Sequence, residues 1–471
     1  MRELASFVAG KWDKGQGKGA VLVNPATEEP LASTSTTGFD FRAVLQFARE
    51  RGGAALRSMT FSQRGEMLRA MSRALHAKRD ELLALAIANG GNTRSDAKFD
   101  IDGATGTLAA YADLAVSLGE TQVLADGESV QLGRGARLFG QHVFVAREGV
   151  AVHVNAFNFP GWGLAEKAAT ALLAGMPVVT KPATSTALVA QRMVEVLVDA
   201  GVVRRGARIN VEADSLNAAI LGMDAAGDSD LLNLFITDVA REITQKTGQK
   251  CTAIRRIYVP HETASSVIDM LAERLNAVKV GDPAREDTTM GPVSTAQQLE
   301  DVRSGVRKLA TCATIVSGSL EPVHERGYFV RPVLLRADAP DPNDAVHTHE
   351  VFGPVATVIP YRDMGDALSL VAAGGGGLVT SLYTNDKVAA RTAVLALAPH
   401  HGRLVLGSSK IVGQSLPPGM ALPQLVHGGP GRAGGGEELG GRRGMSLYMQ
   451  RTALQGDRAF LDAILGVKGT S

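Results

Sequence analysis

Short apolar strands alternate with amphipathic helices in the middle of this chain, and this alternation restricts its fold more than any other feature. The predicted order is strand 149–157, helix 161–176, strand 177–183, helix 185–201 and strand 207–213. Strands separated by helices of this length usually pair in parallel, and the helices cover the sheet. The segment therefore predicts an α/β fold with a parallel sheet wrapped by helices.

The alternation continues beyond this segment, and helices precede it. The later predicted strands are 215–222, 253–259, 327–337, 354–362 and 378–386, and the later helices are 231–246, 262–280 and 387–402. The spacing of apolar residues also predicts helices over 62–85 and 101–117. Because 471 residues exceed what one hydrophobic core usually organises, we expect at least two domains.

The charge balance excludes some classes of function. Forty-nine basic and forty-eight acidic side chains give a net charge of +1, which offers no electrostatic basis for binding nucleic acid or an anionic membrane. The sequence predicts no signal peptide, no transmembrane helix and no metal site. With only two cysteines, a reduced cytoplasmic protein is expected.

One of the two cysteines, Cys251, lies in "TGQKCTAIRR" between a predicted helix and a predicted strand. A thiol is mostly protonated at neutral pH, so a nucleophilic cysteine needs a nearby cation or backbone N–H groups to form the thiolate. Lys250 and the glycine-containing turn are candidates for that help. The alternative is that Cys251, like Cys312, is simply a small buried apolar residue.

Two polar residues follow predicted strands, where side chains of parallel sheets gather around ligands. Glu212 in "NVEADSLN" can act as a general base or can cap the next turn. Asn158 in "NAFNFPGW" can donate to an oxyanion or can form an Asx turn before Pro160.

Two further charged residues have similar alternatives. Lys181 in "VVTKPAT" can bind a phosphate or ribose, or it can be a solvated lysine at a strand end. Glu350 in "EVFGPV" can bind hydroxyl groups or can form a salt bridge.

The order and spacing of these residues are more specific than any one of them. Asn158, Lys181, Glu212, Cys251 and Glu350, within "NFP", "KPA", "GQKC" and "EVFGPV", together resemble the aldehyde dehydrogenase superfamily over nearly the whole chain. Longer stretches such as "VEADSLN", "GQKCTAIRR" and "LVHGGPGRAGGGEELGG" resemble one branch of it. Members of that branch oxidise aldehydes at the end of ring-opened acyl-CoA chains in phenylacetate or benzoate degradation.

The resemblance implies a role for each residue. Cys251 is expected to attack the aldehyde carbonyl, Asn158 to hold the oxyanion and Glu212 to activate water. Lys181, Glu350 and Phe352 are expected to contact the cofactor, and the glycine-rich loop 427–444 to line the site entrance.

The resemblance also implies a Rossmann-type cofactor domain, an α/β catalytic domain and a small oligomerisation element. We expect the cofactor domain over residues 1–222, the catalytic domain over 223–420 and a return to the cofactor and oligomerisation region over 421–471. The expected partners are an acyl-CoA semialdehyde and further copies of the chain.

Residue 184 bears on the choice of cofactor. Relatives that prefer NAD often carry a glutamate three residues after the lysine, and its carboxylate repels the 2′-phosphate of NADP. This chain has Thr184 there, so NADP is the expected cofactor, with NAD as the alternative.

The chain departs from the family between Lys181 and Glu212. The 30 intervening residues suffice for about one helix and its flanking strands, whereas relatives have a further strand, a glycine turn and another helix. That turn and the N-terminus of that helix approach the cofactor phosphates. The sequence thus leaves two hypotheses: a working dehydrogenase, or an impaired homologue that persists as a binding or oligomer-forming subunit. Release of acyl-CoA by thiolysis is disfavoured because Glu212 can activate water.

Overall fold

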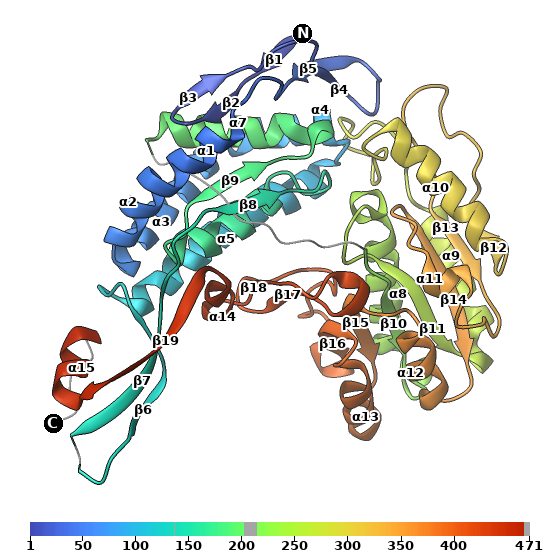
Figure 1. Ribbon diagram of the computed structural model, residues 1–471. Helices are drawn as coiled ribbons and strands as arrows, with labels where there is room; N and C mark the ends of the chain where they lie inside the picture. The colour runs from blue at the N-terminus through green and yellow to red at the C-terminus, as the bar shows by residue number, and fades with distance from the viewer. Residues whose placement is uncertain (136, 202–213, 466–471) are drawn as a thin grey trace.

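The computed structural model describes residues 1–135, 137–201 and 214–465, and these form two halves (Figure 1). The first half is mostly helical and carries a small parallel sheet. The second half is built around a large sheet. Among the helices of the described ranges, none is long and apolar enough to cross a membrane.

Helices from three separate stretches share the core of the first half. These helices are α3 (Phe61–Ala77), α4 (Arg79–Gly90), α5 (Arg94–Leu118), α6 (Trp162–Leu173) and α7 (Ala187–Asp199). The prediction of one helix over 62–85 is wrong in one respect, because the chain leaves helical geometry at Lys78. Asp80 and Glu81 follow in the first turn of α4, where acidic side chains favour a new helix N-terminus.

The predicted strand–helix–strand–helix order after residue 149 is confirmed as far as the description reaches. β8 (Ala151–Val154) pairs in parallel with β9 (Val178–Lys181), and α6 connects them. In the described ranges this sheet has two strands. The strand predicted over 207–213 lies outside the described residues.

N-terminal segments complete this half. They are β1 (Arg2–Leu4), β2 (Ser6–Val8), β3 (Lys11–Asp13), β4 (Ala20–Val23), β5 (Pro30–Thr34), α1 (Phe41–Phe47) and α2 (Ala54–Ser58). β1, β5 and β4 form one sheet, while β2 and β3 form a hairpin.

A seven-stranded sheet organises the second half, in the order β12-β13-β14-β11-β10-β15-β16. Only β12 runs antiparallel to its neighbour. The strands are β10 (Asn217–Leu221), β11 (Ile254–Pro260), β12 (Thr314–Ser317), β13 (Val333–Arg336), β14 (Val355–Tyr361), β15 (Gly377–Tyr383) and β16 (His401–Gly407).

Helices cover both faces of this sheet, as the near-continuous apolar runs of its central strands require. α8 (Ser229–Thr244) and α9 (Ala264–Asn276) lie on one face. α10 (Ala296–Leu309), α12 (Met364–Ala372) and α13 (Lys387–Leu397) lie on the other. The helix predicted to continue to 402 is wrong at its end, because Pro399 cannot continue a helix and β16 begins at His401.

A three-stranded sheet projects from the first half as an arm (Figure 1). It consists of β6 (Leu124–Gln131), β7 (Leu138–Ala146) and β19 (Met449–Asp457), and α15 (Arg458–Leu465) follows β19. β7 and β19 pair antiparallel along their whole length although they lie far apart in the sequence.

The domain boundaries at 222 and 420 stay predictions. β10 ends just before the first boundary, yet both of its partner strands come later in the chain. β17 (Val426–Gly428) and β18 (Glu437–Leu439) form a hairpin in the glycine-rich segment.

Candidate active site

Cys251 lies in the connection between α8 and β11, and the path of the backbone there is unusual. Lys246, Thr247 and Gly248 have φ angles of 52°, 55° and 67°, so three consecutive residues adopt left-handed conformations. A Cβ atom on Gly248 would collide with the carbonyl oxygen of Gly353. Left-handed backbone is costly for residues other than glycine, and it persists only where surrounding contacts enforce it. The contacts that enforce it here surround the nucleophile.

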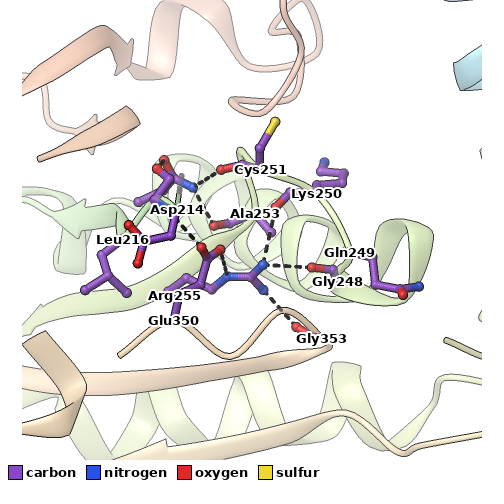
Figure 2. Close-up of polar contacts among 12 residues, drawn as sticks. Asp214, Leu216, Gly248, Gln249, Lys250, Cys251, Ala253, Arg255, Glu350 and Gly353 are labelled. Carbon is purple, nitrogen blue, oxygen red and sulfur yellow. Dashed lines mark hydrogen bonds and ion pairs between the residues drawn. The ribbon is translucent and has the colours of Figure 1, made fainter. Parts of the chain in front are cut away.

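Arg255, four residues after the cysteine, fixes one side of this loop (Figure 2). Its guanidinium donates to the carbonyl oxygens of Gly248 at 2.9 Å, Gly353 at 2.8 Å and Lys250 at 3.3 Å. Its Nε donates to Oε1 of Glu350 at 3.1 Å, and both side chains are more than 90% buried. Because a buried arginine must satisfy its donors, this geometry couples the loop to residues 350–353.

The same pair explains where the structure places Glu350. Its second oxygen accepts the backbone N–H of Ser215 at 2.9 Å. Burial raises the pKa of Glu350, and the charge of Arg255 opposes that rise. The salt bridge considered from the sequence is therefore present, while contact with a cofactor ribose stays a prediction.

Two asparagines hold further carbonyl groups of the loop. Asn217 Nδ2 donates to the carbonyl oxygens of Cys251 at 2.7 Å and Ala253 at 2.9 Å. Asn158 Nδ2 donates to the carbonyl oxygen of Gln249 at 3.1 Å. In Figure 2 the sulfur of Cys251 points away from the Arg255–Glu350 pair. The loop thus directs several carbonyl groups toward side-chain donors and the thiol to the opposite side.

The sequence suggested that Lys250 would direct its charge at the thiol, but in the structure this side chain binds elsewhere. Its Nζ lies 2.7 Å from Oε2 of Glu242 and donates to Oε1 of Gln245 at 2.8 Å, and the Lys250 and Glu242 side chains are fully buried. The other oxygen of Glu242 accepts the N–H of Gly419 at 3.2 Å. This ion pair therefore connects the loop to the segment after residue 418.

The sulfur side of the loop borders a cavity of about 650 Å³. Walls come from the first turns of α5, the start of α6 and residues 419–424, and they include Phe99, Phe159, Trp162 and Leu422. A volume of this size suits a small-molecule ligand, and an apolar lining with few polar groups is typical of such sites. The thiol of Cys251 therefore borders a cavity that can admit a small molecule.

His427 contacts the thiol from the glycine-rich hairpin. Its Nε2 lies 3.8 Å from Sγ of Cys251, and its ring packs against Trp162 with centroids 5.8 Å apart. Burial lowers the pKa of His427 to about 4, so the imidazole is neutral at physiological pH. A neutral ring can donate one N–H to the sulfur.

The predicted cofactor residues divide between two places. Phe352 packs against Phe157 and lies under the guanidinium of Arg255, 5.4 Å away, close to the cysteine loop. Lys181, at the end of β9, and Thr184 are exposed and line a second cavity of about 240 Å³. Glu212 lies outside the described residues, so its role as base stays a prediction.

Several residues of the site were not predicted from the sequence. Asn217 and Glu242 gave no recognisable signal, because their roles depend on contacts with distant segments. His427 lies in the glycine-rich loop expected to line the site entrance, but its contact with the thiol was not predicted. Arg255 stands beside Arg256 in an otherwise apolar strand, and a charged residue in such a strand is a signal that was available.

Comparison with known proteins identifies relatives over nearly the whole chain. The sequence model described as the aldehyde dehydrogenase family matches residues 12–207 and 203–453. The 3,4-dehydroadipyl-CoA semialdehyde dehydrogenase of Aromatoleum evansii is 39% identical, covering 91% of this chain and 93% of that protein. A succinate-semialdehyde dehydrogenase [NADP(+)] of Mycobacterium ulcerans is 26% identical, covering 89% and 95%.

A solved structure supports the same fold. The betaine aldehyde dehydrogenase of Staphylococcus aureus, solved with NAD⁺, superposes with a TM-score of 0.83 at 21% sequence identity, covering 97% of each chain.

These alignments also bear on the shortened segment. The family model matches in two pieces that meet at 203–207. The alignment with the Aromatoleum protein spans 478 positions, more than the 471 residues of this chain, although only 91% of the chain takes part. Residues of the relative therefore lack counterparts here, while the place of the shortening, between Lys181 and Glu212, stays a prediction.

Proposed function

The chain belongs to the aldehyde dehydrogenase family, and we propose that it oxidises a CoA-linked semialdehyde to the carboxylic acid with NADP as hydride acceptor. The observation that carries this proposal is the thiol of Cys251 at the wall of a largely apolar cavity. The name of the Aromatoleum relative supports the substrate class. We place the reaction in the breakdown of an aromatic compound such as phenylacetate or benzoate.

In the proposed mechanism the sulfur of Cys251 adds to the carbonyl carbon and forms a thiohemiacetal. Asn158 uses one amide hydrogen on Gln249 and has a second to donate to the oxyanion. A donor of this kind contributes on the order of 10²–10³ in rate. When bound, NADP supplies the acceptor for the hydride that leaves the substrate carbon. Glu212 then takes a proton from the water that releases the acid from the Cys251 thioester.

The residues at the second cavity suit the adenosine end of a nicotinamide dinucleotide. Lys181 and Thr184 offer an ammonium and a hydroxyl group, and among the residues that the structure describes Lys181 makes no ion pair. Apolar side chains such as Phe7 and Phe39 form the other walls and suit a base. Since ligand sites usually measure about 300–1,000 Å³, this cavity accommodates part of the cofactor.

We expect Thr184→Glu to shift cofactor preference from NADP toward NAD. A carboxylate at this exposed position would repel the 2′-phosphate and remove a hydrogen bond to it, worth about 1.5–3 kcal/mol, or roughly ten- to a hundredfold in affinity. The measurement is the ratio of kcat/KM for NADP and NAD. Thr184→Gln, similar in size but uncharged, is the matched control and should shift the ratio less. An unchanged ratio in Thr184→Glu would remove residue 184 from the ribose site.

The proposed reaction is tested with the purified protein, a CoA-linked semialdehyde and NADP. We expect absorbance to rise at 340 nm and one carboxylic acid, identified by mass spectrometry, to form for each NADPH. Absence of NADPH, together with a weak response to NADP in calorimetric titration, would instead support the impaired homologue.

We also propose that the chain forms homo-oligomers through the arm of β6, β7 and β19. Apolar side chains on this arm and on α15 are exposed, including Val130, Leu138 and Phe460. Exposed apolar clusters of this kind commonly mark association surfaces.

A cytoplasmic location remains part of the proposal, and the free thiols of Cys251 and Cys312 are compatible with it.

A further inference from the structure

Arg403 introduces a positive charge into a mostly apolar strand that packs near the active site. It lies on β16, where the following residues are Leu404, Val405 and Leu406. Its Nη1 donates to the carbonyl oxygen of Met420 at 2.6 Å. Its Nε and Nη2 are shielded from solvent and have no hydrogen-bond partner in the described part of the chain. A buried N–H donor without a hydrogen-bond partner lowers the free energy of unfolding, so we expect an acceptor for these two groups nearby.

The contacts around Arg403 connect it to the wall of the cavity that holds the cysteine. Met420, which Arg403 binds, lines the same cavity as Cys251 and His427. The neighbouring carbonyl of Gly419 accepts the hydroxyl of Thr252, the residue after the nucleophile, at 2.9 Å. A Cβ atom on Gly402 would collide with the carbonyl of Gly428, so β16 also packs closely on the hairpin that carries His427.

Among the described residues around the thiol, Arg403 is a solvent-shielded cation without an ion-pair partner. Lys250 and Glu242 neutralise each other and His427 is neutral, while Arg403 has no ion-pair partner within the ranges that the structure describes. Burial lowers the pKa of Arg403, and electrostatic interaction with Cys251 and Glu242 opposes that lowering.

Other ionisable groups near the site interact within their own clusters. On the elements packed around the loop these are Arg255 with Glu350, Lys246 with Asp96 and Asp100, Lys167 with Glu166 and Glu438, and Arg79 with Asp102. Lys98 lines the cavity and is exposed to solvent.

We propose that Arg403 holds Cys251 as a thiolate before the substrate arrives, and that His427 donates its Nε2–H to the sulfur. The thiol proton passes to solvent. Arg403 acts through Cys251 and is therefore a positioning residue. This inference deepens the proposed function, because it assigns a cause for the reactivity of its nucleophile. An unperturbed thiol has a pKa of about 8.5 and is only a few per cent thiolate at pH 7.

The test is the rate of alkylation of Cys251 by iodoacetamide between pH 5 and 10. Mass spectrometry of the peptides that contain Cys251 and Cys312 follows both thiols in one sample. We expect the midpoint for wild-type Cys251 to lie at least about one pH unit below that of an unperturbed thiol. A wild-type midpoint near 8.5 would overturn the proposal without any variant.

Variants then separate charge from packing. We expect Arg403→Gln to raise the Cys251 midpoint by about one unit or more and to slow alkylation at pH 7 roughly tenfold. Arg403→Lys, which keeps the charge, should retain most of the shift, and His427→Phe should raise the midpoint less than Arg403→Gln does. The Cys312 profile should not move in any variant, which controls for unfolding. A Cys251 midpoint that is the same in wild type and Arg403→Gln would contradict the proposal.

This experiment is independent of the proposed oxidation. Alkylation needs neither aldehyde nor cofactor, so a protein that fails to turn over can still show the lowered midpoint. Conversely, normal turnover with an unshifted midpoint would preserve the proposed function and refute the role of Arg403.

Discussion

Cys251→Ala is expected to abolish aldehyde oxidation, with residual turnover at least about 10³-fold below wild type, because no covalent intermediate can form. The cavity and the carbonyl contacts of the loop do not depend on the sulfur, so the variant should fold normally. The measurement is aldehyde-dependent formation of NADPH, together with mass spectrometry for an acyl group on the peptide that contains residue 251.

Cys312→Ala is the matched control for this prediction. Cys312 follows α10 and packs against the apolar cluster between that helix and the large sheet, and it does not line the cavity, so its substitution should leave turnover unchanged. Glu212→Gln should behave differently from both: it should reduce one equivalent of cofactor, accumulate the thioester and then stall. Sustained turnover by Cys251→Ala, or loss of turnover on substituting Cys312, would contradict the assignment of the nucleophile.

The second large effect concerns the buried ion pair beside the nucleophile. Glu242→Gln leaves the ammonium of Lys250 fully buried without its counter-charge, and removal of one partner of a buried pair typically lowers the free energy of unfolding by about 3–5 kcal/mol. The change is measured by chemical denaturation followed by circular dichroism. Activity should fall as well, since Glu242 also binds Gly419 at the cavity wall.

Two further variants test whether the unpaired charge of Lys250 causes the loss of stability. The double variant Lys250→Met with Glu242→Gln removes both charges and should recover much of the lost stability. Glu300→Gln breaks an ion pair with Arg307 whose side chains are about 60% exposed, and it should have no measurable effect. A double variant as unstable as Glu242→Gln would show that packing, and not the unpaired charge, causes the loss.

Much of the fold could be predicted because its central strands are continuous apolar runs bounded by turns. β8, β9, β11, β14 and β15 all lie within the predicted ranges or within one residue of them. The helix prediction over 387–402 failed where Pro399 ended the helix. The arm was not predicted from periodicity, because β6 and β19 have mostly exposed or half-buried side chains and β7 depends on a partner at the other end of the chain.

The candidate site could be predicted only in part. Cys251 and Asn158 lie in short motifs that mark them, and the structure connects them through Gln249. Lys250 shows the limit of sequence adjacency, because its side chain points to Glu242 although its backbone adjoins the nucleophile. Arg403 and His427 lie more than 150 residues after Cys251. Only the packing of β16 and the hairpin brings His427 to the sulfur and Arg403 to Met420 at the cavity wall.

The pairing of β7 with β19 also has a consequence for how the protein is made. The two strands are separated by about 300 residues, and a ribosome adds about 5–20 residues per second, so β7 waits roughly 15–60 seconds for its partner. During that interval one edge of β7 offers unpaired backbone groups to neighbouring nascent chains. Slower translation lengthens this exposure, so the yield of folded protein should depend on the speed of synthesis as well as on the stability of the finished molecule.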